Sequence, residues 1–247
     1  MSAYFDSLNR RARVAVIRPV PAAPEPAPAP AAQPARRATA PEMAAGYRTL
    51  REKLLVAGKG GRLKTILFAG CEGGEGCTRV VREFADALAS SGLNVLLVDA
   101  DFRTAGLTTS TATQGADLIT LVTSGHPLPA VDWGKGKLTV VPSPIGHPEK
   151  ERFLNDPAMV DWLATQRERY DYVLLDAPPV LGAADGTLLG RLCDGVVVVV
   201  RAARTRRDAI ERARRQLADA GVVVLGAILN RAKSTIPRFL EPYFGHE

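Results

Sequence analysis

The sequence is poor in cysteine and histidine and has no long apolar run. It contains three cysteines and three histidines among 247 residues, and its longest apolar stretches, residues 195–200 and 221–229, have the length of strands. A membrane-spanning helix needs about 20 apolar residues, so no span is predicted. The polar beginning, residues 1–13, lacks the apolar core of a signal peptide. Because scattered cysteines suit a reducing compartment better than a disulfide scaffold, we expect a cytoplasmic protein.

The few cysteines and histidines also give no support for a transition-metal centre. Cys71 and Cys77 are separated by five residues, and no third ligand lies near them in the sequence. This spacing is not typical of zinc or iron–sulfur sites. His126, His147 and His246 stand alone in expected loops or near the end of the chain. Histidine chemistry is therefore not expected.

Positive charge is concentrated in the first part of the chain. The formal net charge is +6, and most of the excess lies in a beginning that continues into a Pro/Ala-rich stretch, residues 20–41. Such a stretch is extended and has no packed core, so we expect a flexible, disordered basic arm over residues 1–41 and a folded domain over 42–247. We interpret the arm as solubilising and expect no nucleic-acid partner. A second basic cluster contains Arg201, Arg204, Arg206 and Arg207.

Strand-like and helix-like runs alternate from residue 63 onward. Most strand-like runs are continuous Val/Ile/Leu segments, which is typical of parallel strands covered on both faces. The alternation predicts a three-layer α/β domain with a mostly parallel sheet, and a further helix is expected to begin near Pro41. The predicted strands are 63–69, 94–99, 137–141, 172–176, 195–201 and 222–230, and the predicted helices among them are 78–91, 156–168 and 205–220.

A glycine-rich segment joins the first predicted strand to the helix that follows it. Residues 70–78 are Gly-Cys-Glu-Gly-Gly-Glu-Gly-Cys-Thr. A strand, a glycine-rich turn and a helix start form the context of a Walker A phosphate loop, in which backbone N–H groups converge on a phosphate. We therefore predict a P-loop NTPase-like domain in which Cys77 replaces the Walker A lysine and Thr78 binds magnesium. A redox sensor, in which the helix N-terminus lowers the pKa of Cys77, is the alternative interpretation.

Acidic residues follow two of the predicted strands. Asp99 and Asp101 come at and after the end of one strand, and Asp176 ends another. Ligands of parallel sheets bind beyond the carboxyl ends of the strands, and a buried carboxylate needs a partner. Carboxylate oxygens are ligands that Mg²⁺ prefers. The sequence therefore predicts a site for ATP or ADP with Mg²⁺ at this edge.

Three motifs identify a family when they are taken together. They are Gly-Gly-Glu-Gly-x-Thr, Leu-Leu-Val-Asp-Ala-Asp-Phe-Arg and Tyr-Asp-Tyr-Val-Leu-Leu-Asp-Ala-Pro-Pro-Val-Leu. They resemble the bacterial tyrosine kinase (BY-kinase) family, a MinD/ParA-type branch of P-loop proteins that works in capsule and exopolysaccharide assembly. The resemblance implies catalytic roles for Asp99, Asp101 and Asp176, and a magnesium site made by Thr78, Asp99 and Asp176. The nucleotide-binding residues that it implies are Gly73, Gly74, Glu75, Gly76, Cys77, Thr78, Arg79 and Asn230, with Asn230 contacting the base.

The chain departs from the family pattern at three places. Cys77 removes the cation aimed at the transferred phosphate, and Arg79 is expected to compensate in part. The family phosphorylates a tyrosine-rich tail, whereas Tyr243 is the lone candidate acceptor here. Relatives carry Glu-x-x-Arg-x-x-Arg on the first helix to contact neighbouring subunits, and Ala45 replaces the glutamate. This weakens the expectation of a ring but leaves a homo-oligomer open.

These features predict a BY-kinase-like nucleotide-binding protein that regulates exopolysaccharide or capsule polymerisation or export. Because of Cys77, phosphotransfer is expected to be weak or absent, as in a pseudokinase. The expected partner is a membrane chain-length-determinant or export protein, which would hold the chain at the inner membrane. An active protein-tyrosine autokinase or ATPase of the same pathway is the alternative. A MinD/ParA-like positioning ATPase is less favoured, since Glu72 occupies the position of that branch's additional lysine.

Overall fold

The computed structural model describes residues 40–57, 63–111, 116–125, 128, 137–144, 153–154 and 156–232. All of them belong to one compact unit, Thr39–Ala232. The predicted arm, except for its last two residues, and the candidate acceptor Tyr243 lie outside the described residues and stay predictions. Among the residues described, no helix combines the length and the apolar character that crossing a membrane requires.

Six strands form one parallel sheet in the order β3-β2-β4-β1-β5-β6. The strand β1 therefore has β4 and β2 on one side and β5 and β6 on the other. Because all the strands run in one direction, their carboxyl ends meet at the same edge of the sheet. The strands are β1 Thr65–Gly70, β2 Asn94–Asp99, β3 Lys137–Val141, β4 Tyr172–Ala177, β5 Gly195–Arg201 and β6 Val224–Asn230.

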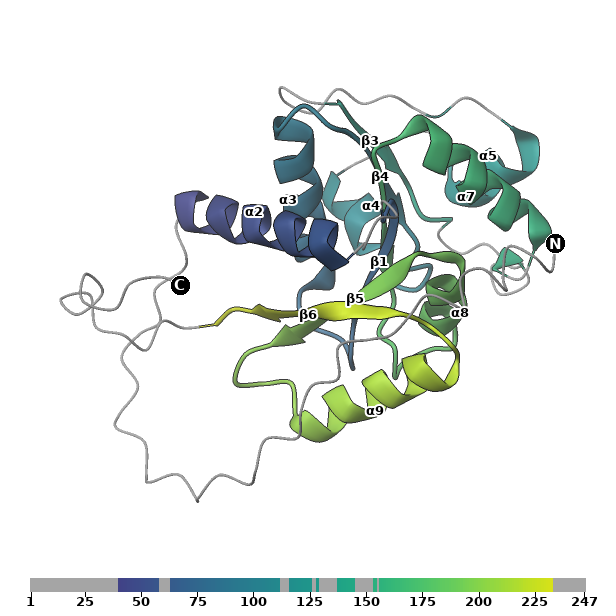
Figure 1. Cartoon of the computed structure of the whole chain (residues 1–247). Coiled ribbons are helices and arrows are strands. Elements are labelled where there is room, and N and C mark those ends of the chain that lie inside the picture. Colours follow the sequence, from purple (N-terminus) through teal and green to yellow (C-terminus); the bar gives the residue numbers. More distant parts are fainter. Residues whose placement is uncertain are drawn as a thin grey trace, which may run out of the picture. The chain divides into compact units, whose positions relative to one another are not determined.

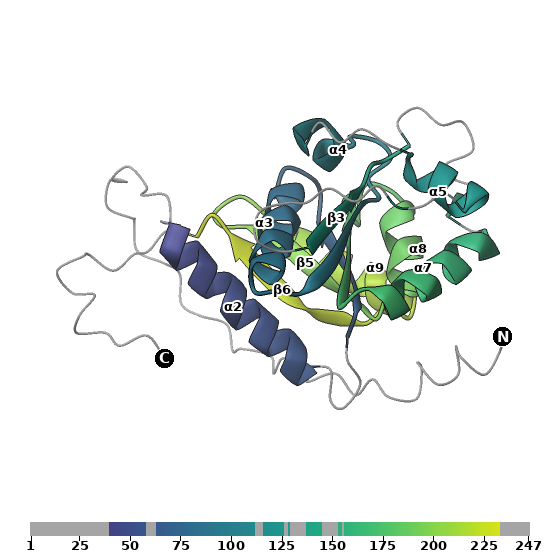
Figure 2. The same cartoon turned by 90° about the horizontal axis from the view of Figure 1, so that it is seen from above.

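Helices cover both faces of this sheet (Figures 1 and 2). One apolar core lies between the sheet and α2, α3 and α4, and a second lies between the sheet and α5, α7, α8 and α9. The predicted three-layer architecture is thus confirmed. The helices are α2 Ala40–Ala57, α3 Cys77–Ser90, α4 Gly106–Thr111, α5 Leu118–Ser124, α7 Pro157–Arg169, α8 Asp185–Leu192 and α9 Arg207–Asp219.

Burial explains why the strands could be found in the sequence. Every residue of β1 and β4 is buried, and the apolar runs of these strands pack against helices on both faces. The edge strand β6 is only partly buried. Predicted and observed strand limits agree within two residues, whereas α4, α5 and α8 were not predicted.

The helix α3 is anchored firmly on β1, and this anchoring positions the loop between them. Phe84 of α3 is fully buried, and its ring centroid lies 5.8 Å from that of Phe68 in β1 and 6.1 Å from that of Tyr47 in α2. Burying a side chain of this size contributes about 1.5–3 kcal/mol. The two ends of the glycine-rich loop are therefore fixed by the core rather than by the loop itself.

Candidate functional site

The glycine-rich loop runs from the end of β1 to the start of α3, as predicted. Gly73, Gly74 and Gly76 have φ angles of 113°, 77° and 86°, which residues with a Cβ rarely adopt. A Cβ at Gly76 would also lie 2.7 Å from Nδ2 of Asn230. Conformation and space therefore both require glycine at this position.

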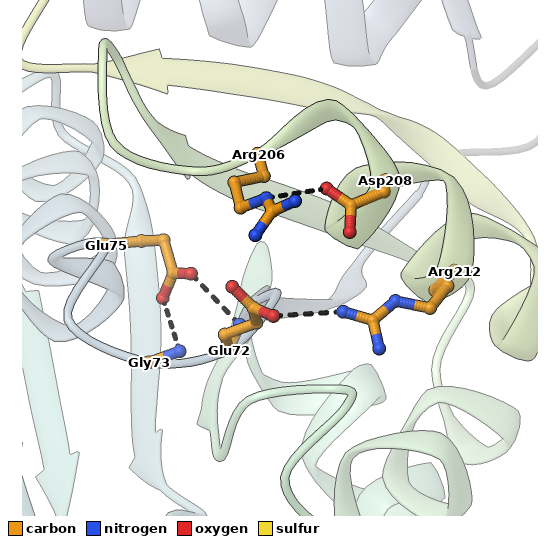
Figure 3. Close-up of polar contacts among 6 residues, drawn as sticks. All are labelled: Glu72, Gly73, Glu75, Arg206, Asp208 and Arg212. Carbon is orange, nitrogen blue, oxygen red and sulfur yellow. Dashed lines mark hydrogen bonds and ion pairs between the residues drawn. The ribbon is translucent and has the colours of Figure 1, made fainter.

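The side chain of Glu75 turns back into the loop and stabilises it (Figure 3). It is only 4% exposed, and its carboxylate accepts hydrogen bonds from the backbone N–H of Glu72 (3.0 Å) and of Gly73 (2.8 Å). A Cβ at Gly70 would lie 2.5 Å from this carboxylate. Glu75 thus satisfies the first donors of the loop and leaves the N-terminus of α3 to other partners.

The N-terminus of α3 has no side-chain cap. Its N-cap residue is Gly76, which has no side chain to accept a hydrogen bond from the backbone N–H groups of the first turn. The first N–H groups of a helix have no intrahelical partner and carry partial positive charge. Cys77, Thr78 and Arg79 supply these groups, which makes the turn suited to an anion.

Neighbouring segments hold the loop from both sides. On the β5–β6 side, Asn230 Nδ2 donates to the carbonyl oxygen of Glu75 (2.8 Å), and Arg201 Nη1 donates to that of Gly74 (3.4 Å). On the β4 side, the backbone N–H of Val180 donates to Gly70 O (2.9 Å) and that of Leu181 to Cys71 O (3.0 Å). The loop is therefore pre-organised by contacts that leave the start of α3 uncapped.

The carboxylates of Asp99 and Asp101 are buried and accept hydrogen bonds from residues close in the sequence. Asp99 accepts hydrogen bonds from the backbone N–H (2.7 Å) and Oγ1 (2.6 Å) of Thr108, and from the N–H of Asp101 (3.2 Å). Asp101 accepts from the N–H groups of Arg103 (3.1 Å) and Thr104 (3.2 Å). Burial raises the pKa of Asp99, which the bonds from Thr108 oppose. Both side chains hold the segment after β2 in place.

Asp176 is the carboxylate that the structure brings directly to the loop. It is 1% exposed, and the side chains of Thr78 and Cys77 donate hydrogen bonds to it. Its Oδ2 has no hydrogen-bond partner among the described residues. Burial raises the pKa of Asp176 to about 7; the charges of Asp99 and Asp101 act in the same direction, and the two hydrogen bonds oppose it. A buried carboxylate oxygen without a partner at the start of a helix points to a cationic or hydrogen-bonding ligand.

The surroundings of Cys77 favour the neutral form of its thiol. Desolvation, followed by the negative charge of Asp176, raises its pKa well above the ordinary value of a thiol. Burial, and after it the charge of Asp176, therefore act against the lowered pKa that the redox alternative requires. Cys77 contributes no positive charge where the Walker A motif has a lysine.

Arg79 points along α3 in this structure. Its Nε lies 2.6 Å from Oε1 of Glu83, and its side chain is 59% exposed. Glu83 also accepts a hydrogen bond from the hydroxyl of Tyr47 (2.7 Å). The predicted compensation for the lost lysine by Arg79 stays a prediction, and it requires this pair to separate.

The donor set fits a magnesium ion only if the ion has other ligands as well. No group of three His, Cys, Asp or Glu side chains that could hold a metal ion occurs among the described residues. Thr78 and Asp176 would contribute one hydroxyl and one carboxylate oxygen, whereas both oxygens of the predicted ligand Asp99 already accept hydrogen bonds. Mg²⁺ commonly has few protein ligands and several waters and phosphate oxygens, so this set is compatible with it.

Two residues of the site escaped sequence reasoning. Thr108 donates twice to Asp99, and Arg201 contacts the Gly74 carbonyl. Arg201 had been recognised only as part of a basic cluster, and Thr108 lies on the helix α4, which had not been predicted. The signal for Arg201 was its place at the carboxyl end of a strand.

Together these features define a class of protein. The strands are parallel, a glycine-rich loop leads from β1 into α3, and Asp176, next to the end of the neighbouring strand β4, faces this loop; these features make a P-loop NTPase-like fold. A family model described as AAA domain matches residues 63–212, and the chain belongs to this family.

The relatives agree with the predicted resemblance to bacterial tyrosine kinases, which is confirmed. The tyrosine-protein kinase CpsD of Streptococcus agalactiae is 27% identical over 201 residues, covering 78% of this chain and 85% of CpsD. The kinase domain of the Escherichia coli tyrosine kinase ETK has a TM-score of 0.70 at 23% identity, covering 83% of this chain and 81% of that one. Cobyrinic acid a,c-diamide synthase from Mycobacterium smegmatis, solved with ADP and magnesium, has a TM-score of 0.56 at 24% identity, covering 68% and 76%. The two solved structures show likeness of fold.

Proposed function

We propose that this chain binds ATP or ADP with Mg²⁺ at the loop after β1, and transfers phosphate weakly or not at all. The observation that carries the proposal is the uncapped start of α3 beside the unpartnered Oδ2 of Asp176. The N–H groups of this turn would bind phosphate oxygens. Thr78 and Asp176 would hold the magnesium ion, which would neutralise charge between the phosphates.

The weak transfer follows from Cys77. Phosphoryl transfer is mostly positioning and charge stabilisation, and loss of an arginine finger in related enzymes costs about 10³–10⁵ in rate. Ground-state binding would lose less, about 1.5–3 kcal/mol for one charge-assisted hydrogen bond. The neutral thiol of Cys77 donates to Asp176 instead of reaching toward a phosphate. Binding would therefore survive a substitution that slows the chemistry.

Calorimetric titration of the full chain with Mg-ADP and Mg-ATP tests the binding. We expect saturable binding that is at least about tenfold weaker than in the Cys77→Lys variant, since the variant regains one charge-assisted hydrogen bond. Asp176→Asn is expected to bind with less dependence on magnesium. Absence of binding by the wild type at millimolar nucleotide contradicts the proposal.

An active tyrosine autokinase is the second candidate, and the likeness to CpsD favours it. Phosphotyrosine mass spectrometry after incubation with Mg-ATP separates the two. Weak transfer predicts little labelling of wild type, and more in the Cys77→Lys variant. Strong labelling of wild type that Asp99→Ala abolishes would establish the active kinase instead. A MinD/ParA-like role has less support, because Glu72 forms an ion pair with Arg212 of α9 (3.1 Å, Figure 3) instead of offering a lysine.

We place this activity in capsule or exopolysaccharide assembly, as the resemblance to the bacterial tyrosine kinase family implies. A membrane chain-length-determinant or export protein would then be the partner and would hold this chain at the cytoplasmic side of the inner membrane. Co-purification of the chain with such a protein from membranes tests this part of the proposal. A chain that stays in the soluble fraction when the partner is co-expressed contradicts it.

A further inference from the structure

Three arginines lie at or just after the ends of β5 and β6, and one of them contacts the glycine-rich loop. Arg201 is the last residue of β5 and is paired in register with Asn230, the last residue of β6. Arg204 lies in the turn after β5, and Arg231 follows β6 directly. We call Arg201, Arg204 and Arg231 the β5–β6 arginine group. The hydrogen bond from Arg201 Nη1 to the Gly74 carbonyl (3.4 Å) connects the group to the loop.

The backbone that carries this group is fixed in unusual conformations. Thr205 Oγ1 accepts a hydrogen bond from the N–H of Arg201 (2.9 Å), and the N–H of Thr205 donates to the carbonyl of Arg201 (2.9 Å). Ala203 and Arg231 have φ angles of 57° and 56°, in the left-handed region that residues with a Cβ adopt at a cost. The surrounding structure therefore holds the arginines in place against local preference.

The positive charges of the group have no carboxylate partner among the residues that the structure describes. Other arginines near the loop have carboxylate partners, since Arg206 lies 3.1 Å from Asp208 and Arg212 lies 3.1 Å from Glu72 (Figure 3). Within the part of the chain that the structure describes, no ion pair joins a member of the β5–β6 arginine group to a carboxylate. Desolvation and the charges of Arg231 and Arg204 lower the pKa of Arg201. Like charges gathered without a counterion favour binding of an anion.

The strand order places the carboxylates on one side of β1 and the arginines on the other side. Asp99 and Asp176 lie at the ends of β2 and β4, on one side of β1, and the arginine group lies at the ends of β5 and β6, on the other. A ligand with a metal-bound part and a free anionic part matches this arrangement. A magnesium-bound polyphosphate has this composition.

We propose that the β5–β6 arginine group binds phosphate oxygens of the nucleotide and supplies the positive charge that Cys77 does not. This inference rests on the proposed nucleotide binding. The three arginines would supply the affinity for nucleotide that a lysine in the loop supplies in a Walker A motif. Guanidinium groups form paired hydrogen bonds with phosphate oxygens and stay charged at any physiological pH. Affinity then depends on the phosphates of the ligand and on the salt concentration.

The test compares two charge-matched double variants of the full chain, R204Q/R231Q and R214Q/R215Q. Arg201 is left in place because it also contacts the loop backbone. Arg214 and Arg215 are exposed residues of α9 for which the described residues show no contact with the loop, so the control makes the same change in net charge. Calorimetry measures binding of Mg-ADP and of inorganic tripolyphosphate, each at low salt and at about 1 M NaCl, where charges are screened beyond about 3 Å. Circular dichroism checks that each variant is folded.

We expect R204Q/R231Q to bind both ligands about tenfold more weakly than R214Q/R215Q at low salt, as partly exposed charge-assisted bonds would give. The difference should shrink at high salt. Equal binding of Mg-ADP by both variants overturns the inference while leaving the proposed function intact. Weaker binding of Mg-ADP with unchanged binding of tripolyphosphate also overturns it, because the arginines would then hold the nucleoside. A wild type that binds neither ligand refutes the proposed function, and this inference with it.

Discussion

Asp176→Asn should stabilise the protein above neutral pH. The carboxyl group is 1% exposed, and burial together with the charges of Asp99 and Asp101 raises its pKa from 3.8 to about 7. No basic side chain contributes to this shift. The ionised form of Asp176 is therefore a cost of folding, and asparagine removes that cost while its oxygen can still accept the bonds from Thr78 and Cys77.

The sign and size follow from proton linkage. Between about pH 4 and pH 7 the folded protein keeps the proton of Asp176 and the unfolded chain has released it, so stability falls as the pH rises. At about 1.4 kcal/mol per pH unit, the wild type loses about 4 kcal/mol over this window, and the loss is complete above the folded-state pKa. Asparagine loses some hydrogen-bond energy of its own, about 1 kcal/mol. The variant should thus be about 2–4 kcal/mol more stable than wild type at pH 8, and within about 1 kcal/mol of it at pH 5.

Urea unfolding in EDTA at pH 5, 6, 7 and 8 measures this difference without metal ions. Asp208→Asn is the control, because Asp208 is 57% exposed in its pair with Arg206 and should change stability little. A difference between Asp176→Asn and wild type that stays constant from pH 5 to pH 8 would refute the reasoning. So would a variant that is less stable than wild type at pH 8.

Three further changes test the local contacts. Thr108→Val removes the Oγ1 hydrogen bond to buried Asp99 and keeps the backbone N–H bond, so it should lower the unfolding free energy by about 1.5–3 kcal/mol, measured by urea unfolding; an unchanged midpoint would show that the hydroxyl contact is dispensable. Gly76→Ala places a Cβ at a φ of 86° and 2.7 Å from Asn230 Nδ2, so a loss of about 1–3 kcal/mol is expected, and wild-type stability would contradict the loop geometry. Because the pKa of Cys77 is raised, iodoacetamide at pH 8 should modify Cys77 more slowly than free cysteine, measured by peptide mass spectrometry; a faster reaction would contradict this environment.

The fold could be predicted where a short segment of sequence carries the signal for its own secondary structure. A strand buried on both faces is apolar at most positions, and β1, β2, β4 and β5 could be found for that reason. The helices α4 and α5 were missed because they are short and contain several threonines, which are weak helix formers. The limits of α5 did have a signal, since Asp117 caps its start through Thr120 N and Gly125 ends it with a φ of 65°.

The site was predictable in its positions but not in its contacts. Asp99, Asp101 and Asp176 could be chosen because they follow apolar strands, and the strand order brings them to one edge. Which of them faces the loop depends on the path of the chain after each strand. Thr108 engages Asp99 from α4, whereas only Asp176 keeps an oxygen without a partner. Contacts of this kind depend on tertiary packing. The rule that ligands bind at the carboxyl ends of parallel strands does not predict them.

The substitution at position 77 connects these observations. A lysine beside Asp176 would place an ammonium group next to a buried carboxylate and lower its pKa. Cys77 instead leaves that carboxylate without a cation, so its ionisation is costly until a ligand brings positive charge. Magnesium is such a ligand, and it would enter with the phosphates that the β5–β6 arginine group attracts. If the proposed function holds, a bound metal–nucleotide complex would complete the charge balance of the site, and its binding would be coupled to the ionisation of Asp176.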